Sequence, residues 1–161
     1  MFDFFFYGTL VDADVRRLVL GRAIPDSTVT PALLPGHARH PVVGQPYPGT
    51  VASEGSTVDG VVLGGLDVRD AARLSNFEGD DYLATLCPIV LAADGSPATA
   101  WVYIATGRVS LAPGPWSVEA WREDHKAAFI KVGRGWIRDR GDAALARHEA
   151  FWRARLATGG G

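Results

Sequence analysis

The segment 82–106, "YLATLCPIVLAADGSPATAWVYIAT", constrains the fold more than any other part of the chain. Two long apolar runs flank Ala-Asp-Gly-Ser, residues typical of a tight turn between antiparallel strands. Both runs are apolar at odd and at even positions, so both faces of the hairpin must be covered. We therefore expect strands that curl into a small barrel or lie beneath helices. Pro88 has no amide hydrogen and predicts a bulge or a sheet edge in the first arm.

A second buried strand is predicted by the stretch 2–10, "FDFFFYGTL". Phe and Tyr rings pack well on a pleated surface, and here they occupy both faces, which places the strand in the middle of a core. Gly8 is the first residue of this stretch that has no side chain to shield its backbone and that readily adopts a positive φ. A sharp turn whose N–H groups are accessible should therefore follow. Taken alone, this stretch favours an ordinary turn over a ligand-binding loop.

The segments between these strands alternate helical and strand patterns. Residues 12–21 and 67–79 each begin at an Asp cap and end at a Gly, and both predict short helices. Residues 57–66 form a β-branched strand pattern whose glycines indicate bulges or close backbone approach. Residues 22–56 are rich in Pro, Gly, Ser and Thr, and predict loops with one or two strands around "TPALL" at 30–34 and "HPVV" at 40–43.

The C-terminal third predicts helices. Residues 107–116 form a Gly/Pro loop, residues 117–132 and 142–156 are helical, and residues 157–161 form a disordered tail. In the first of these helices an apolar stripe includes His125 as a core histidine, with Val118, Trp121, Ala128 and Val132. The order of elements predicts an α+β fold with a mostly β core and helices outside. The many aromatic side chains of this region should pack on the barrel or form a homodimer contact: Trp116, Trp121, Phe129, Trp136, Phe151 and Trp152.

Composition excludes several classes of function. The chain has 161 residues, 47% of them apolar and 21% charged, which is typical of one globular domain. A net charge of −2 argues against nucleic acid or an anionic membrane as the partner. The single cysteine, Cys87, lies in an apolar run, which predicts a buried side chain that packs like a small apolar residue. Asp3 stands where a secretion signal carries Lys or Arg, and no window is long enough for a membrane span, so we expect a cytoplasmic protein.

The sequence offers little support for a metal or a nucleotide cofactor. His37 and His40 stand three residues apart in a Pro-flanked segment that reads as a loop, but zinc needs three or four ligands and no convincing remainder is present. The chain has no phosphate-binding loop, no dinucleotide-binding glycine motif and no G-x-S-x-G. We expect neither a metal nor a cofactor.

The stretch 76–82, "NFEGDDY", is the best candidate for acid–base chemistry. If Phe77 points into the core, Glu78 is partly buried, and burial together with the charges of Asp80 and Asp81 would raise its pKa. A carboxylate tuned in this way suits a general base near neutral pH. Composition alone favours a solvated acidic turn instead. A Mg²⁺ or Ca²⁺ loop is a third reading, although the spacing does not match an EF-hand.

Several short motifs together resemble the gamma-glutamylcyclotransferase-like family, and most closely its bacterial and plant avirulence-induced branch. They are "YGTL" at 7–10, "YPGT" at 47–50, "VDGVVLGGLD" at 58–67, "FEGDDY" at 77–82 and "WVYI" at 101–104. The resemblance covers residues 2 to about 106, and "WSVEAWREDHKAAF" is similar to the plant-type C-terminal extension. It implies a small mixed β-barrel domain with flanking helices over residues 1–110. The helical extension over residues 111–161 would pack on the same domain.

The resemblance also implies a site at one end of the barrel. Glu78 would be the catalytic base, and the loop Tyr7, Gly8, Thr9 and Leu10 would bind a glutamyl group through backbone N–H groups. Tyr82 and Tyr103 would line the same cavity. The reaction would be attack of the substrate α-amine on its own γ-amide, giving 5-oxoproline and a free amine or amino acid, with no metal or cofactor. Two alternatives remain: a non-catalytic protein that binds a small metabolite, and an enzyme that removes a gamma-glutamyl group in a biosynthetic pathway.

Overall fold

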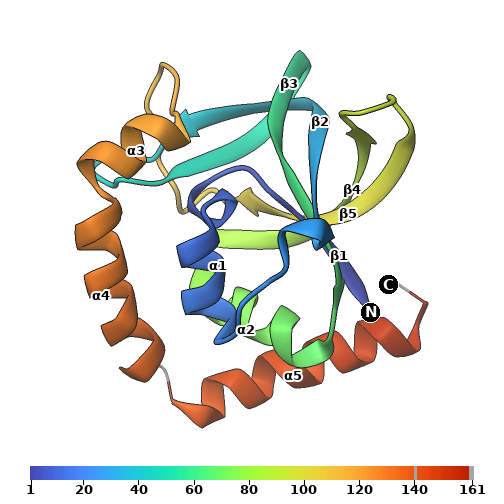
Figure 1. The fold of residues 1–161 in the computed structure, drawn as a ribbon, viewed down its shortest axis with the longest axis vertical. Helices are drawn as coiled ribbons and strands as arrows, with labels where there is room; N and C mark the ends of the chain where they lie inside the picture. Colours follow the sequence, from blue (N-terminus) through green and yellow to red (C-terminus); the bar gives the residue numbers. More distant parts are fainter. Residues whose placement is uncertain (140, 160–161) are drawn as a thin grey trace.

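The computed structural model describes residues 1–139 and 141–159. Along the first two thirds of the chain the order is β1-α1-β2-β3-α2-β4-β5, and the helices α3, α4 and α5 follow (Figure 1). The strands are β1 (Phe2–Phe6), β2 (Val29–Pro41), β3 (Pro48–Leu66), β4 (Tyr82–Leu91) and β5 (Pro97–Ala105). The helices are α1 (Ala13–Leu20), α2 (Val68–Glu78), α3 (Val118–Asp124), α4 (Lys126–Asp139) and α5 (Asp142–Ala157). Short 3₁₀ turns are η1 (Thr9–Val11), η2 (Asp26–Thr28) and η3 (Gly79–Asp81).

The strands close into a barrel in the order β1-β3-β2-β4-β5, which confirms the predicted α+β barrel. All neighbours are antiparallel except β1 and β5, which run parallel where Phe4 pairs with Trp101. Strand β4 pairs with β2 only near its end, at Val90 and Leu91. Pro88 lies outside that short pairing, so the predicted edge at this proline is present.

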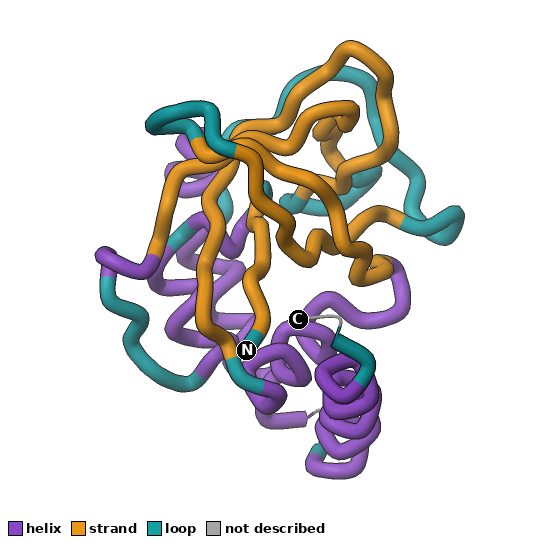
Figure 2. Tube along the Cα trace, turned by 90° about the vertical axis from the view of Figure 1, so that its right-hand side faces the viewer, coloured by secondary structure: helices purple, strands orange, loops and turns teal. Residues whose placement is uncertain are grey.

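Alternation along the strands explains why both of their faces are apolar. In β1, Phe5 points into the barrel, where it packs with residues such as Leu34 and Val102. Its neighbours Phe4 and Phe6 point the opposite way, toward the helices. The barrel interior and the layer between barrel and helices are therefore two separate apolar clusters. Figure 2 shows the helices gathered beside and below the strands.

Helix α5 is part of the core, as its aromatic residues predict. Trp152 is fully buried, and its ring meets Phe2, Phe4 and Trp101 edge to face at centroid distances of 5.0, 5.3 and 5.0 Å. Its Nε1 donates a hydrogen bond to Ser75 Oγ of α2 at 2.9 Å. Figure 1 shows α5 running beneath α2 and the barrel. The C-terminal helices thus complete the apolar layer on the outer face of β1.

The predicted N-caps of the first two helices and the predicted close approach of backbones at a glycine are also present. Asp12 caps α1 by accepting from the amides of Asp14 and Val15, and Asp67 caps α2. A Cβ placed on Gly60 would lie 2.2 Å from the Phe6 carbonyl oxygen, so only a glycine lets β1 and β3 approach this closely.

The expectation that residues 22–56 are mainly loops is wrong, although the strand expected around residues 30–34 is present as part of β2. Most of that segment forms β2 and the first part of β3, which pair as a long antiparallel ribbon. Pro and Gly normally break strands, but here they fall where the ribbon tolerates them. Gly36, at φ +72°, sits at the register shift between Pro35 and His37. His37 and His40 therefore lie on a strand and not in a loop.

The predicted helix over residues 117–132 is two helices. The chain breaks at His125, whose φ of −131° and ψ of −21° end α3 before α4 begins. This break shifts the phase of the helical faces, so Trp121 and Phe129 are buried while His125 and Val132 are exposed. The prediction that His125, Ala128 and Val132 belong to a buried apolar stripe is therefore wrong, because all three side chains are exposed.

Two smaller expectations also need correction. The hairpin is not covered on both faces, because Leu83 and Leu86 of β4 have exposed fractions of 62% and 48%. The predicted tail is helical at Ala157 and continues as a turn through Thr158 and Gly159, with the Thr158 hydroxyl donating to backbone carbonyls of α5. Residues 160 and 161 of that prediction lie outside the described residues.

No helix within the described residues is both long and apolar enough to cross a membrane. Cys87 is buried in the barrel interior, and burial raises the pKa of its thiol, consistent with a packing role.

Candidate active site

A pocket of about 190 Å³ opens at the end of the barrel where β1 runs into η1. Its volume is below the roughly 300–1,000 Å³ typical of sites for drug-sized ligands, and it suits a ligand of amino-acid size. Its walls come from β1, η1, the end of α2, the turn before β3, the paired ends of β4 and β5, and one face of α4. The residues to which the sequence assigned a role all line it: Tyr7, Gly8, Thr9, Leu10, Glu78, Tyr82 and Tyr103.

The loop after β1 turns tightly at Gly8. The Gly8 carbonyl oxygen accepts a hydrogen bond from the Val11 amide at 3.0 Å, which closes the 3₁₀ turn η1. The first N–H groups of such a turn have no partner within it, so the amides of Thr9 and Leu10 suit an anionic group. Gly8 has a φ of −121° and does not use the positive φ that glycine can adopt. A Cβ at this position would lie 3.1 Å from the Pro48 ring, so glycine leaves room for this close approach.

Two arginines from different elements, Arg39 and Arg16, bind the backbone carbonyls of this loop. Arg39 of β2 donates from Nη1 to the carbonyl oxygen of Tyr7 at 2.9 Å. Arg16 of α1 is buried and donates from Nη1 to the carbonyl oxygens of Leu10 and Val11, at 3.0 and 2.7 Å. Both guanidinium groups bind backbone carbonyl oxygens. They therefore hold the loop in place without using its amide N–H groups.

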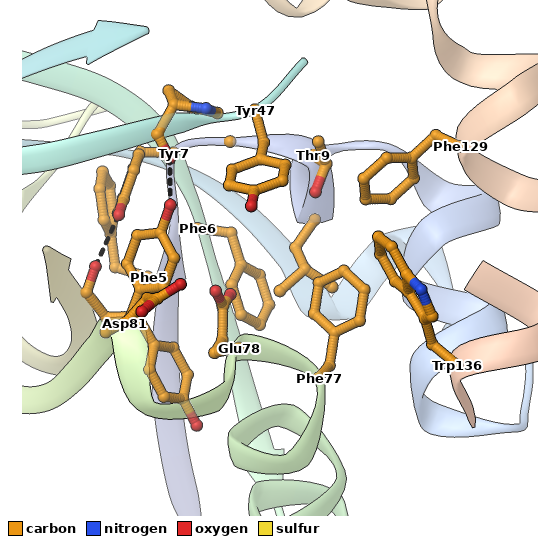
Figure 3. A pocket seen from close by; sticks show the side chains of 15 residues that line it. Phe5, Phe6, Tyr7, Thr9, Tyr47, Phe77, Glu78, Asp81, Phe129 and Trp136 are labelled. Carbon is orange, nitrogen blue, oxygen red and sulfur yellow. Dashed lines mark hydrogen bonds between the residues drawn. The ribbon is translucent and has the colours of Figure 1, made fainter. Parts of the chain in front are cut away.

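Glu78 is the last residue of α2, and its side chain enters the pocket. Figure 3 shows its carboxylate between the rings of Phe6, Tyr47 and Phe77. The carboxylate has no hydrogen-bond or ion-pair partner among the residues that the structure describes. Burial raises the pKa of Glu78 to about 8. The raised pKa predicted from the sequence is therefore present.

The predicted contribution of Asp80 and Asp81 to this pKa is wrong. Burial alone raises the pKa of Glu78, because both aspartates are exposed to solvent. Asp80 lies 4.0 Å from Arg108, and Asp81 lies at the rim of the pocket. Solvent screens charges placed in this way.

The tyrosine hydroxyls of the pocket differ in their partners. Tyr7 donates to the Tyr103 carbonyl at 2.6 Å, and Tyr82 donates to the Pro48 carbonyl at 3.0 Å. The Tyr103 hydroxyl bonds with Ser75 Oγ at 2.9 Å. These three hydroxyls are part of the framework, so Tyr103 and Tyr82 shape the cavity through their rings and not through a free hydroxyl.

Tyr47 is a pocket residue to which sequence reasoning assigned no role, although it begins the "YPGT" motif. Its hydroxyl makes no hydrogen bond to any residue that the structure describes, and Figure 3 shows it directed toward Glu78. Burial raises the pKa of Tyr47, and the charges of Asp81 and Glu78 raise it further. Tyr47 therefore presents a neutral O–H donor to anything that binds beside Glu78.

Phe129 and Trp136 of α4 also line the pocket, a position that no pattern in the sequence indicates. Among the described residues no Lys, Arg or His lines it, and its charged groups are Glu78 and Asp81. Residues 1–139 and 141–159 contain no cluster of three or more His, Cys, Asp or Glu side chains that could hold a metal ion. The site therefore combines backbone donors, one tyrosine hydroxyl, an unpaired carboxylate and aromatic walls.

The buried carboxylate of Glu78 should change how the free energy of unfolding depends on pH. Glu78 keeps its proton up to a pH of about 8 when folded, whereas the ordinary pKa is 4.5. Between these values the native state binds the extra proton, so Glu78 makes stability fall as the pH rises. Relative to the wild type, Glu78→Gln should raise the free energy of unfolding by on the order of 2–4 kcal/mol at pH 9 and by much less at pH 5.

Urea unfolding of both proteins at the two pH values measures this effect, and Asp80→Asn serves as the control. Equal pH dependence in the wild type and in Glu78→Gln would show that Glu78 titrates normally.

Comparison with known proteins identifies the family. Residues 4–123 match the family model described as gamma-glutamyl cyclotransferase, AIG2-like. Protein AIG2 C of Arabidopsis thaliana is 27% identical over 131 residues, which are 81% of this chain and 78% of the relative. AIG2-like protein D of the same plant is 30% identical over 134 residues, 82% of this chain and 86% of the relative.

Solved structures agree with this match. A solution structure of an Arabidopsis thaliana protein has a TM-score of 0.63 and 29% identity, and the match covers 81% of this chain and 87% of that one. A structure described as a gamma-glutamyl cyclotransferase has a TM-score of 0.55 at 14% identity, with 83% and 86% covered, and shares the fold. With the barrel and its motifs in register, the match over residues 4–123 shows that the chain belongs to the gamma-glutamyl cyclotransferase, AIG2-like family.

Proposed function

We propose that this protein is a cofactor-free gamma-glutamyl cyclotransferase that releases 5-oxoproline and a free amine or amino acid. The observation that carries the proposal is the carboxylate of Glu78, which lies in a small pocket beside the amides of η1. It has no partner among the described residues, and burial raises its pKa to about 8. A carboxylate of this kind accepts a proton from an ammonium group near neutral pH. Family membership supports the same class of reaction.

The pocket suits each demand of the reaction. The α-carboxylate of a glutamyl group would bind the amides of Thr9 and Leu10, since no basic side chain among the described residues lines the pocket. The α-ammonium would pair with ionised Glu78, which takes one proton from it. The freed amine attacks the γ-carbonyl carbon, and the bond from that carbon to the leaving nitrogen breaks. Glu78 gives this proton to the leaving nitrogen as that bond breaks. It then takes the surplus proton from the new ring nitrogen and passes it to the released amine, which leaves as an ammonium ion.

The substrate supplies its own nucleophile in this scheme, so the enzyme needs none. Holding the amine against the carbonyl in a five-membered geometry supplies on the order of several kcal/mol of the barrier reduction. The Tyr47 hydroxyl faces this space and would donate to the oxyanion that forms on the carbonyl. Cys87 lies in the barrel interior and takes no part.

A substrate screen tests the proposal. Purified protein is incubated with gamma-glutamyl amino acids, gamma-glutamyl amines and glutathione, and 5-oxoproline is measured with and without a chelator. We expect release from at least one class, unchanged by chelation. Tight binding of these compounds with no product would instead favour the non-catalytic binding protein. Release of glutamate would favour an enzyme that removes gamma-glutamyl groups by hydrolysis.

A further inference from the structure

We infer that Ser75 is a positioning residue for Glu78, and that its hydroxyl ties the end of α2 that carries Glu78 to helix α5 through Trp152. This role deepens the proposed function and rests on it, because Glu78 is a base only in that reaction. Two hydrogen bonds that meet at Ser75 Oγ carry the inference. One comes from the Trp152 indole and the other is shared with the Tyr103 hydroxyl, each at 2.9 Å.

Ser75 begins the last turn of α2, on which Glu78 stands. The Ser75 carbonyl oxygen accepts a hydrogen bond from the Gly79 amide, which closes this turn around Glu78. Residues three apart on a helix are neighbours on its surface, so Ser75 and Glu78 share one side of α2. The Glu78 carboxylate has no partner of its own among the described residues, and burial is what raises its pKa. Its place in the pocket therefore depends on how this turn is held.

The Trp152 indole makes a directed bond in addition to its packing. An indole N–H can only donate, so Ser75 Oγ is the acceptor, and the Trp152 side chain is fully buried. The indole nitrogens of Trp101 and Trp121 are buried too, but they have no partner among the described residues. Trp152 lies beyond residues 4–123, so α5 supports the site from a part of the chain that the family model does not match.

Tyr103 connects the Ser75 hydroxyl to the other side of the site. The Tyr103 hydroxyl bonds with Ser75 Oγ, and its backbone carbonyl accepts from the Tyr7 hydroxyl at 2.6 Å. Tyr7 is the last residue before the loop that leads into η1, and the rings of Tyr7 and Tyr103 are both buried. This second link therefore sets how far Glu78 lies from the η1 amides that would bind the substrate carboxylate.

Loss of the Ser75 hydroxyl should release the end of α2. Ser75→Ala leaves the buried indole N–H of Trp152 without its acceptor, although alanine keeps the helix. We expect kcat for 5-oxoproline release to fall roughly ten- to a hundredfold, because a small displacement of the base misaligns proton transfer. KM should change little, since the η1 amides keep their own supports. Ser75→Thr retains the hydroxyl and should retain most of the activity.

Two variants on α5 separate this role from general packing. Trp152→Phe keeps a buried ring but lacks the N–H, so it should lower kcat by itself. It should add little to the effect of Ser75→Ala, because both changes break the same link. Phe151→Ala removes an exposed ring from the neighbouring position and should leave kcat unchanged. Fully additive losses for Ser75→Ala and Trp152→Phe would contradict the link to α5.

Titration of Glu78 in the absence of substrate separates failure of this inference from failure of the proposed function. In protein labelled with ¹³C at the glutamate carboxyl groups, the Glu78 signal is the one that Glu78→Gln removes. It should titrate at a pKa of about 8 in the wild type. The other titratable groups that line the pocket are four tyrosines, which stay neutral at this pH, and one carboxylate at the rim: Tyr7, Tyr47, Tyr82, Tyr103 and Asp81.

Ser75→Ala should move the midpoint of this titration down by roughly one to two pH units, because the released turn exposes the Glu78 carboxylate to water. Ser75→Thr and Phe151→Ala should leave the midpoint where the wild type has it. This result would support the positioning role even if no 5-oxoproline is ever released. A wild-type midpoint in Ser75→Ala would overturn the inference, and so would wild-type kcat in that variant of an active enzyme.

Discussion

Glu78→Gln is expected to lower the turnover number for 5-oxoproline release by about two to four orders of magnitude. Gln is nearly isosteric with Glu, but its amide cannot accept a proton from the substrate ammonium. The fold should persist, because the wild-type carboxylate has no partner to lose among the described residues and burial already disfavours its charge. Substrate binding should weaken moderately, since the η1 amides and the Tyr47 hydroxyl remain. Steady-state kinetics on the best substrate of the screen measures the change.

Asp80→Asn and Asp81→Asn are the matched controls. Both positions lie within three residues of Glu78, but both side chains are exposed and neither raises its pKa. Each change should therefore cost less than about tenfold in turnover. Near wild-type turnover in Glu78→Gln would remove Glu78 from the role of base.

Trp152→Ala is expected to lower the free energy of unfolding by about 3–5 kcal/mol. The ring is fully buried and meets Phe2, Phe4 and Trp101, so its removal leaves a cavity that these rings cannot fill. It also leaves Ser75 Oγ without the indole donor that it has in the wild type. Urea unfolding by circular dichroism measures the loss.

Phe151→Ala tests whether this effect is specific to burial. Phe151 is the next residue back on α5 and 41% of it is exposed, so its loss should cost less than about 1.5 kcal/mol. Equal losses for the two variants would mean that α5 does not complete the core in the way that the structure shows.

Much of the barrel follows from local pattern. The hairpin over residues 82–106 and the strand at the N-terminus have apolar residues on both faces, and a barrel with helices on its outer face is one way to cover both. The caps at Asp12 and Asp67 fix where α1 and α2 begin. The ribbon of β2 and β3 was not predictable in this way, because its prolines and glycines are strand breakers unless they fall at an edge or a register shift.

The candidate site could be predicted only in part. Glu78 follows Phe77 in the sequence, so its burial could be inferred from a single apolar neighbour. The sequence did not show that burial alone raises the pKa of Glu78, because the exposure of Asp80 and Asp81 depends on how the chain turns at η3. Phe129 and Trp136 enter the site from a helix about fifty residues further along the chain, and the position of that helix depends on the break at His125.

The reaction in water enriched in ¹⁸O tests the central claim most directly. In cyclisation the substrate amine forms the new bond and water takes no part, so mass spectrometry should find unlabelled 5-oxoproline in equal amount to the freed amine. Glu78→Gln should abolish both products together. Glutamate carrying one ¹⁸O atom, formed in place of 5-oxoproline, would show that water is the nucleophile and would contradict the proposed cyclotransferase.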